Sequence, residues 1–177
     1  MRSFKNYSRN SRENRCLASN ADCRSDVSEF RSEAGKSALD MPAGYSKRSL
    51  VDKLGIRAAS RIAIIHPPEG YDSTLGALPQ NVSVSARATS NLDFIQAFFI
   101  EAKKLNREFP ALKKALNPNG MLWISWPKKA ANTTTDLNEN VVRDIGLANG
   151  LVDIKVCAVD ETWSGLKFVY RKAQRGS

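Results

Sequence analysis

Short apolar runs alternate with amphipathic segments from about residue 46 onward, and this pattern predicts the elements of the fold. Nearly continuous apolar runs are typical of strands buried on both faces, and they predict strands at 61–66, 93–100 and 121–126. The alternating segment 81–85 predicts a strand near a sheet edge. The segments 151–159 and 166–170 predict a closing pair of strands, and their short connection indicates that this pair is antiparallel.

Short helices are expected around the first strand. Ser46 can cap a helix whose inner face carries Leu50, Val51 and Leu54, and Gly55 is suited to its C-terminus. One or two helical turns are expected within 69–78. Helices that alternate with short apolar strands predict an α/β layer with a mainly parallel sheet.

Two longer helices are expected in the second half of the chain. Between 102 and 116 the apolar residues fall at helical spacing, and Pro110 predicts two short helices or a kink there. Asp136 followed by Glu139 has the spacing of a capping box. We therefore expect a helix that is capped by Asp136 and ends near Gly150.

Residues 1–40 differ from the rest, because they are rich in Ser, Arg and Asn and contain few large apolar residues. Such a segment buries too little surface to offset its ordering entropy. We expect a disordered tail over 1–40 and a single α/β domain over 41–177. The compositional change falls at Met41, so a wrongly assigned start is an alternative. A basic recruitment arm and a transit peptide are further alternatives, and the acidic residues from Glu13 onward count against the transit peptide.

The chain is basic, with 27 Lys and Arg against 18 Asp and Glu and a net charge of +9. This excess favours anionic partners, although a solvated basic surface explains it equally well. The cations beside the apolar stripe of 102–116 allow the same two interpretations. We predict an anionic small molecule or a protein as the partner. Nucleic acid is the least favoured partner, because the chain contains no recognised nucleic-acid motif.

Cysteine and histidine usage limits the chemistry. Cys16, Cys23 and Cys157 form no CxxC pair, and their odd number suits no disulfide framework. A reducing compartment is the natural interpretation. We find no apolar core of a signal peptide and no apolar run of the roughly 18 residues that a membrane span needs. We therefore predict a cytoplasmic protein with no membrane partner. His66 is the only histidine, so we predict no metal site.

Candidate binding residues gather where the predicted strands end. In open α/β sheets, ligands bind beyond the carboxyl ends of the strands, and 66–71, 126–129 and 160–165 are expected there. Tryptophan can stack on a planar ligand, and lysine can pair with an anionic group. We predict a ligand site formed by these residues: Glu69, Tyr71, Trp126, Lys128, Lys129, Asp160, Trp163 and Ser164.

Several of these positions also have a structural interpretation. His66 is the candidate catalytic base, but a hydrogen-bonded imidazole at a strand end explains it as well. Trp123 is expected in the core, on the same side of its strand as Trp126. Asp160 and Glu161 are adjacent and point to opposite sides in a strand, so they do not form a convergent acid–base pair.

One family resemblance concerns the fold. The segment LNPNGML at 116–122 resembles the Leu-x-Pro-Gly-Gly-x-Leu turn before the fifth strand of class I, S-adenosylmethionine (SAM)-dependent methyltransferases. Their fourth strand is similar to 93–95, and their last strand pair is similar to 150–152 and 165–169. The resemblance implies a compact Rossmann-like sheet, preceded here by the N-terminal tail.

The same resemblance fails at the cofactor site. In that family the first strand leads into a glycine-rich loop that cradles SAM. The corresponding loop here reads HPPEG at 66–70 and keeps one glycine, and Ala86 and Arg87 stand where the ribose-binding acid is expected. We find no GxGxxG or P-loop pattern. SAM therefore has no support from a glycine-rich loop, and the cofactor is left open.

A closer resemblance covers nearly all of residues 41–177. The motifs GYS at 44–46, KLGI at 53–56, PEGY at 68–71, WPKK at 126–129 and DETWSG at 160–165 are similar to a small bacterial protein family known as a domain of unknown function. This resemblance implies no activity. Members of that family typically begin near Met41, which supports the later start.

Three functions follow from these observations. The first is a methyltransferase-like domain that no longer methylates and binds a small ligand or a protein. The second is an enzyme with an altered nucleotide-type site, in which His66 is the base, Lys128 holds an anion, and Trp126 or Trp163 stacks on the substrate. The third is a nucleic-acid binder.

Overall fold

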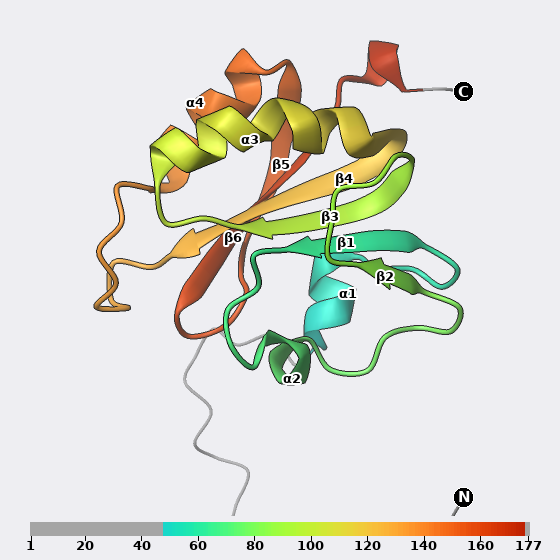
Figure 1. The fold of residues 1–177 in the computed structure, drawn as a ribbon, viewed down its shortest axis with the longest axis horizontal. Coiled ribbons are helices and arrows are strands. Elements are labelled where there is room, and N and C mark those ends of the chain that lie inside the picture. Colours follow the sequence, from blue (N-terminus) through green and yellow to red (C-terminus); the bar gives the residue numbers. More distant parts are fainter. Residues whose placement is uncertain (1–47, 176–177) are drawn as a thin grey trace, which may run out of the picture. The chain divides into compact units, whose positions relative to one another are not determined.

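The structure is a computed structural model that describes residues 48–175. These residues lie in one compact unit, Gly44–Ser177, shown in Figure 1. The tail predicted for 1–40, the boundary at Met41 and the predicted cap Ser46 lie outside the described residues. The strands are β1 Arg61–Ile65, β2 Ser83–Ser85, β3 Leu92–Phe98, β4 Leu116–Pro127, β5 Leu151–Ala158 and β6 Trp163–Tyr170. The helices are α1 Leu50–Leu54, α2 Tyr71–Leu75, α3 Ala102–Ala115, α4 Glu139–Ala148 and the short 3-10 helix η1 Lys172–Gln174.

The six strands form one sheet in the order β2-β1-β3-β4-β6-β5. The strands β2, β1, β3 and β4 are parallel, and β6 runs antiparallel between β4 and β5. The short β2 lies at one edge, as its alternating pattern predicts. This arrangement confirms the predicted α/β class, with a mainly parallel Rossmann-like sheet and antiparallel C-terminal strands.

Helices cover both faces of the sheet, with α3 and α4 on one face and α1 and α2 on the other (Figure 1). Because side chains alternate along a strand, each inner strand contributes to two separate cores. Ile62 and Ile64 of β1 pack in the core beneath α1 and α2. Ala63 and Ile65 pack in the core beneath α3 and α4. Burial on both faces explains why these strands have nearly continuous apolar sequences.

The two tryptophans of β4 lie on opposite faces of the sheet. Trp123 belongs to the core beneath α1 and α2, where its indole Nε1 donates to the Leu54 carbonyl over 3.1 Å. Trp126 belongs to the core beneath α3 and α4. The prediction that they share a side is wrong, because they are three positions apart and an odd separation reverses the face.

Two helix N-caps differ from the prediction. The N-cap of α1 is Ser49, whose hydroxyl accepts from the Asp52 amide, while Gly55 ends the helix with φ 84° as expected. The N-cap of α4 is Asn138, whose side chain accepts from two amides of the first turn. Asp136 caps α3 instead, because its Oδ1 accepts from the Ala102 amide over 2.7 Å.

Pro110 lies inside a single continuous helix, α3, and the expected division into two short helices is wrong. The buried stripe of Leu105, Phe109 and Leu112 packs on the sheet along the whole helix. That burial offsets the backbone hydrogen bond that proline is unable to donate.

Gly146 allows α4 to approach β6 closely, and its replacement tests this packing. A β-carbon at this position would lie 2.1 Å from Cε1 of the fully buried Phe168 ring. We expect Gly146→Ala to lower the free energy of unfolding by about 1–3 kcal/mol despite the better helix propensity of alanine. Denaturant unfolding at unchanged slope measures the loss.

The neighbouring Leu147 supplies the control, because it is 40% exposed on the same helix. We expect Leu147→Ala to change the free energy of unfolding by no more than about 0.5 kcal/mol. A Gly146→Ala variant as stable as the wild type would show that α4 moves away from β6 without cost.

Candidate functional site

The order of the strands reverses between β1 and β3. The chain leaves β1 toward β2 on one side and leaves β3 toward β4 on the other side. In open α/β sheets, the space beyond the carboxyl ends at such a reversal is the usual ligand site. The loop 66–70 follows β1 at this point and leads into α2.

His66 begins this loop in a left-handed backbone conformation, with φ 52°. Its Nε2 lies 3.0 Å from Glu108 Oε2 of α3, and its ring meets the edge of Phe99 at a centroid distance of 5.8 Å. Partial burial raises the pKa of Glu108, but His66, Lys104 and Arg107 together outweigh this effect, so the pKa lies below its usual value. The lone histidine is therefore fixed against α3.

Tyr71 lies at the start of α2 and is directed into the core rather than toward the loops. Only 2% of Tyr71 is exposed, and its hydroxyl is hydrogen-bonded to Gln96 Oε1. Gln96 Nε2 in turn donates to Ser125 Oγ over 3.2 Å. Burial raises the pKa of Tyr71 well above its usual value, although the bond with Gln96 opposes this shift. The three side chains form a buried polar row across α2, β3 and β4.

Phe98 joins Tyr71 to Trp163. Its ring contacts Tyr71 at a centroid distance of 4.7 Å and Trp163 at 5.1 Å, both edge to face. Two predicted site residues from distant parts of the chain thus meet beneath α1 and α2. Trp163 is half-buried there.

The loops after β4 and before β6 are bonded to each other. The Lys128 amide donates to the Thr162 carbonyl over 2.8 Å, and the Lys128 ammonium donates to the Asp160 carbonyl over 2.6 Å. The Asp160 carboxylate accepts from the Thr162 and Trp163 amides, each over 2.7 Å. Lys128 and Asp160 therefore hold the two loops together.

A groove of about 900 Å³ opens beside this junction, at the carboxyl end of β4. Its walls come from the end of β4, the loop that follows it, the start of α4 and the start of β6. The lining residues are Trp126, Pro127, Lys128, Lys129, Thr133, Thr134, Thr135, Asp136, Leu137, Asn138, Glu139, Asn140 and Ser164.

Hydrogen bonds fix the outer wall of the groove to the β3–α3 junction. The Thr135 hydroxyl donates to the Ile100 carbonyl over 2.7 Å and accepts from the Leu137 amide over 3.1 Å. Asp136 binds the first amide of α3, at Ala102. These contacts join the wall to two neighbouring elements and preorganise the groove.

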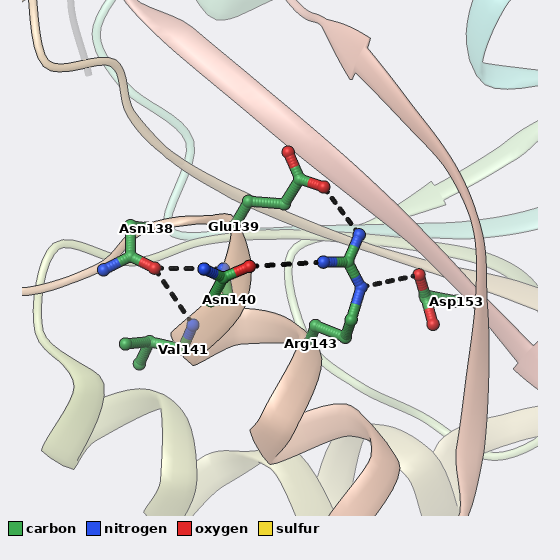
Figure 2. Close-up of polar contacts among 6 residues, drawn as sticks. All are labelled: Asn138, Glu139, Asn140, Val141, Arg143 and Asp153. Carbon is green, nitrogen blue, oxygen red and sulfur yellow. Dashed lines mark hydrogen bonds and ion pairs between the residues drawn. The ribbon is translucent and has the colours of Figure 1, made fainter.

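The start of α4 forms the other wall, and its charges are paired (Figure 2). Asn138 Oδ1 accepts from the Asn140 and Val141 amides over 3.0 and 3.1 Å. Arg143 Nη2 lies 2.6 Å from Glu139 Oε1, and its Nε lies 2.9 Å from Asp153 Oδ2 of β5. The hydrogen bonds with Asp153 and Glu139 raise the pKa of Arg143. The carboxylate of Glu139 is thus directed to Arg143.

The structure separates the predicted site by the faces of the sheet. Trp126, Lys128, Lys129 and Ser164 come together around the groove, on the side of α3 and α4. Tyr71 and Trp163 meet on the side of α1 and α2. Glu69 is exposed in the loop before α2, and Asp160 lies at the loop junction. Trp126 is only 6% exposed, so it forms the floor of the groove and not a free stacking surface.

Sequence reasoning missed several polar partners at this edge. Gln96 and Ser125 lie in segments predicted as apolar strands, where one polar residue in a hydrophobic run was the available signal. Glu108 is 42 positions from His66, so no local pattern indicates their contact. Within residues 48–175 we find no group of three His, Cys, Asp or Glu side chains that could hold a metal ion. Among the same residues, no helix has the length and apolarity needed to cross a bilayer.

Comparison with known proteins identifies the kind of fold. No family model and no curated protein matches the sequence. Among solved structures, the DhpI–SAH complex is 9% identical, with 70% of this chain and 83% of that chain covered and a TM-score of 0.51. A possible exported protein from Bordetella parapertussis is 11% identical, with 68% and 64% covered and a TM-score of 0.51. A SAM-dependent methyltransferase from Aquifex aeolicus is 14% identical, with 67% and 86% covered and a TM-score of 0.46.

These likenesses concern the fold and not the chemistry. The strand order, the antiparallel C-terminal pair and the likeness to the DhpI–SAH complex agree with a methyltransferase-like, Rossmann-type domain. The resemblance to the small bacterial family stays a prediction, since no family model matches.

The backbone of His66 gives a testable prediction about strain. A left-handed conformation disfavours every side chain relative to glycine. We expect His66→Gly to be more stable than His66→Ala by about 1 kcal/mol, because both lose the contact with Glu108 and differ only in the β-carbon. Thermal unfolding of the two variants gives the difference. Equal stability would indicate that the loop relaxes out of the left-handed region.

The buried polar row gives a second prediction. Gln96→Leu would leave the hydroxyls of Tyr71 and Ser125 without their partner, and we expect a loss of about 1–3 kcal/mol in the free energy of unfolding. Adding Tyr71→Phe to this variant should recover part of that loss, since it removes one of the two hydroxyls left without a hydrogen-bond partner. A double-mutant cycle with strictly additive losses would contradict the coupling.

Proposed function

We propose that this domain is a methyltransferase-like binding module that holds a small polar, anionic ligand in the groove at the carboxyl end of β4. The groove itself is the observation that supports the proposal. It joins four predicted site residues from the end of β4, the loop after β4 and the start of β6, namely Trp126, Lys128, Lys129 and Ser164. Its volume of about 900 Å³ falls within the range of small-molecule sites.

The polar groups of the groove favour an anionic ligand. Both carboxylates in its walls have structural partners, because Asp136 binds the Ala102 amide and Glu139 binds Arg143. The exposed Lys129 lines the groove and forms no ion pair with a described residue. Thr134 adds a hydroxyl that can donate to a carboxylate or phosphate, whereas the Thr133 hydroxyl donates to the Ala131 carbonyl over 3.0 Å.

The loop after β1 argues against the usual methyltransferase cradle. A cofactor cradle needs amide donors and close approach of the backbone, which glycine provides. The loop 66–70 begins with His66 and two prolines, and a proline has no amide hydrogen to donate. The Tyr71 amide, at the start of α2, binds the Pro68 carbonyl over 3.2 Å. This loop therefore gives little support to SAM binding and leads us to propose a non-methylating module.

The enzyme alternative rests on one observation. His66 lies at the strand reversal in a strained backbone conformation, paired with Glu108 at 3.0 Å. Strain of this kind occurs preferentially at functional sites, and a carboxylate can orient an imidazole as a base. In this second candidate function, His66 would act on a ligand bound beyond β1, outside the groove.

A ligand titration of the full chain tests the proposal and separates it from the alternative. We expect citrate or adenosine monophosphate to raise the melting temperature saturably. At a hundred times the dissociation constant, the ligand should add about 2.7 kcal/mol to the free energy of unfolding. Lys129→Gln should weaken the effect strongly, because Lys129 is the exposed one of the two groove lysines, whereas the Lys128 ammonium is bonded to the Asp160 carbonyl. Lys114→Gln, an equal charge loss at an exposed position of α3, should preserve it.

S-adenosylhomocysteine, the SAH of the DhpI–SAH complex, is the comparison ligand. Saturable binding of this compound that His66→Ala removes and Lys129→Gln preserves would contradict the groove module and favour an active site beyond β1. If neither citrate nor adenosine monophosphate raises the melting temperature of the wild type, this result also counts against the proposal.

A further inference from the structure

A second concentration of positive charge lies away from the groove, on the α1 side of the β5–β6 hairpin. Lys155 and Lys167 are direct partners across these antiparallel strands. Both side chains belong to the α1 face. The Lys155 ammonium donates to the Lys53 carbonyl at the end of α1 over 3.2 Å, and Lys167 lies opposite Trp123 of β4. Like charges directly opposite each other destabilise a sheet.

Two arginines complete this cluster. Arg57 follows α1 and lines a hollow of about 340 Å³ at the amino ends of β1 and β3. Arg175 follows η1, and its Nε donates to the Tyr170 carbonyl at the end of β6 over 2.7 Å. Partial burial and the charges of Lys155, Arg57 and Arg175 together lower the pKa of Lys167. Lys167 is therefore close enough to the other three cations to be repelled by each of them.

Within residues 48–175, none of these four side chains forms an ion pair. The acid nearest in sequence on β5, Asp153, is bound by Arg143 of α4 and so lies on the opposite face. Among the described residues the fold thus retains a half-buried lysine near three other cations with no ion-paired carboxylate. Asp93 lines the same hollow as Arg57, but it accepts from the Arg61 amide over 3.0 Å.

We propose that Arg57, Lys155, Lys167 and Arg175 form a binding site for a ligand with at least two adjacent phosphate groups. Four cations exceed the charge of a single phosphate, which carries at most about two negative charges near neutral pH. Arginine can bind phosphate oxygens in a bidentate manner, and lysine acts as a point charge. A diphosphate would remove the repulsion between Lys155 and Lys167 and complete the charge balance of the hairpin.

The site is separate from the groove and does not depend on the function proposed for it. The groove lies at the carboxyl end of β4, on the side of α3 and α4. The phosphate site lies on the opposite face of the hairpin. The same phosphate chemistry can come from a free diphosphate or from neighbouring phosphates of a nucleic-acid strand.

Titration of the full chain with inorganic pyrophosphate, at about 50 mM salt to limit screening, tests the proposal. We expect saturable binding that Lys167→Gln weakens about tenfold or more, the effect of losing one charge-assisted contact. Lys167→Gln should also raise the melting temperature of the ligand-free protein, because it relieves repulsion. Unfolding therefore provides no explanation for a loss of binding in this variant.

Lys114→Gln, an equal charge loss at an exposed position of α3, is the control and should bind pyrophosphate like the wild type. Absence of saturable binding, equal binding by Lys167→Gln and wild type, or a loss that follows Lys129→Gln in the groove instead of Lys167→Gln would each overturn the proposal.

A labelled single-stranded oligonucleotide distinguishes the two sources of phosphate. Oligonucleotide binding that falls steeply with salt, is displaced by pyrophosphate and is weakened by Lys167→Gln assigns the site to nucleic acid. Pyrophosphate binding without oligonucleotide binding assigns it to a small diphosphate ligand.

Discussion

Burial of both faces of β3 and β4 is the constraint on which the rest of this structure depends. Most side chains of these strands enter one of two cores, so polar groups there must satisfy one another. Gln96 and Ser125 do so with Tyr71, and no buried side-chain polar atom among the described residues is left without a partner. The side chains available for ligand binding therefore lie in the loops at the strand ends and on the hairpin β5–β6, and not in the centre of the sheet.

The same constraint divides the carboxyl edge by face. The sheet separates residues that follow one another along the chain, so Trp163 packs against Phe98 on one side while Ser164 lines the groove on the other. A ligand in the groove contacts the end of β4 and the start of α4, whereas a ligand at the strand reversal would contact the loop after β1. Groove and loop are therefore distinct sites in this small domain, and occupation of one does not require the other.

Much of the fold follows from the sequence because it rests on local signals. Apolar runs indicated β1, β3 and β4, alternation indicated the edge strand β2, and the positive φ of Gly55 follows from its place after a helical pattern. The errors arose where a residue acts on a distant partner. Asp136 has the spacing to cap α4, but it caps α3 because the loop returns to the β3–α3 junction. The site was predicted as one pocket because the sequence places residues at strand ends without fixing the face of the sheet on which each side chain lies. The pairing of Lys155 with Lys167 depends on the register of β5 and β6, which the sequence does not reveal.

Acidic and basic side chains have different partners in this domain, and this difference explains how it keeps two accessible cationic regions. Carboxylates are used largely for structure: Asp93 accepts from the Arg61 amide, Asp136 caps α3, and Asp160 holds the loop before β6. Several lysines instead donate to backbone carbonyls, as Lys113 does to Asn149 and Lys128 to Asp160. A hydrogen bond to a neutral backbone group leaves the formal charge of either side chain in place. Lys129 at the groove and Lys155 and Lys167 at the hairpin form no ion pair with a described residue, so their positive field attracts anions to both regions before any specific contact forms.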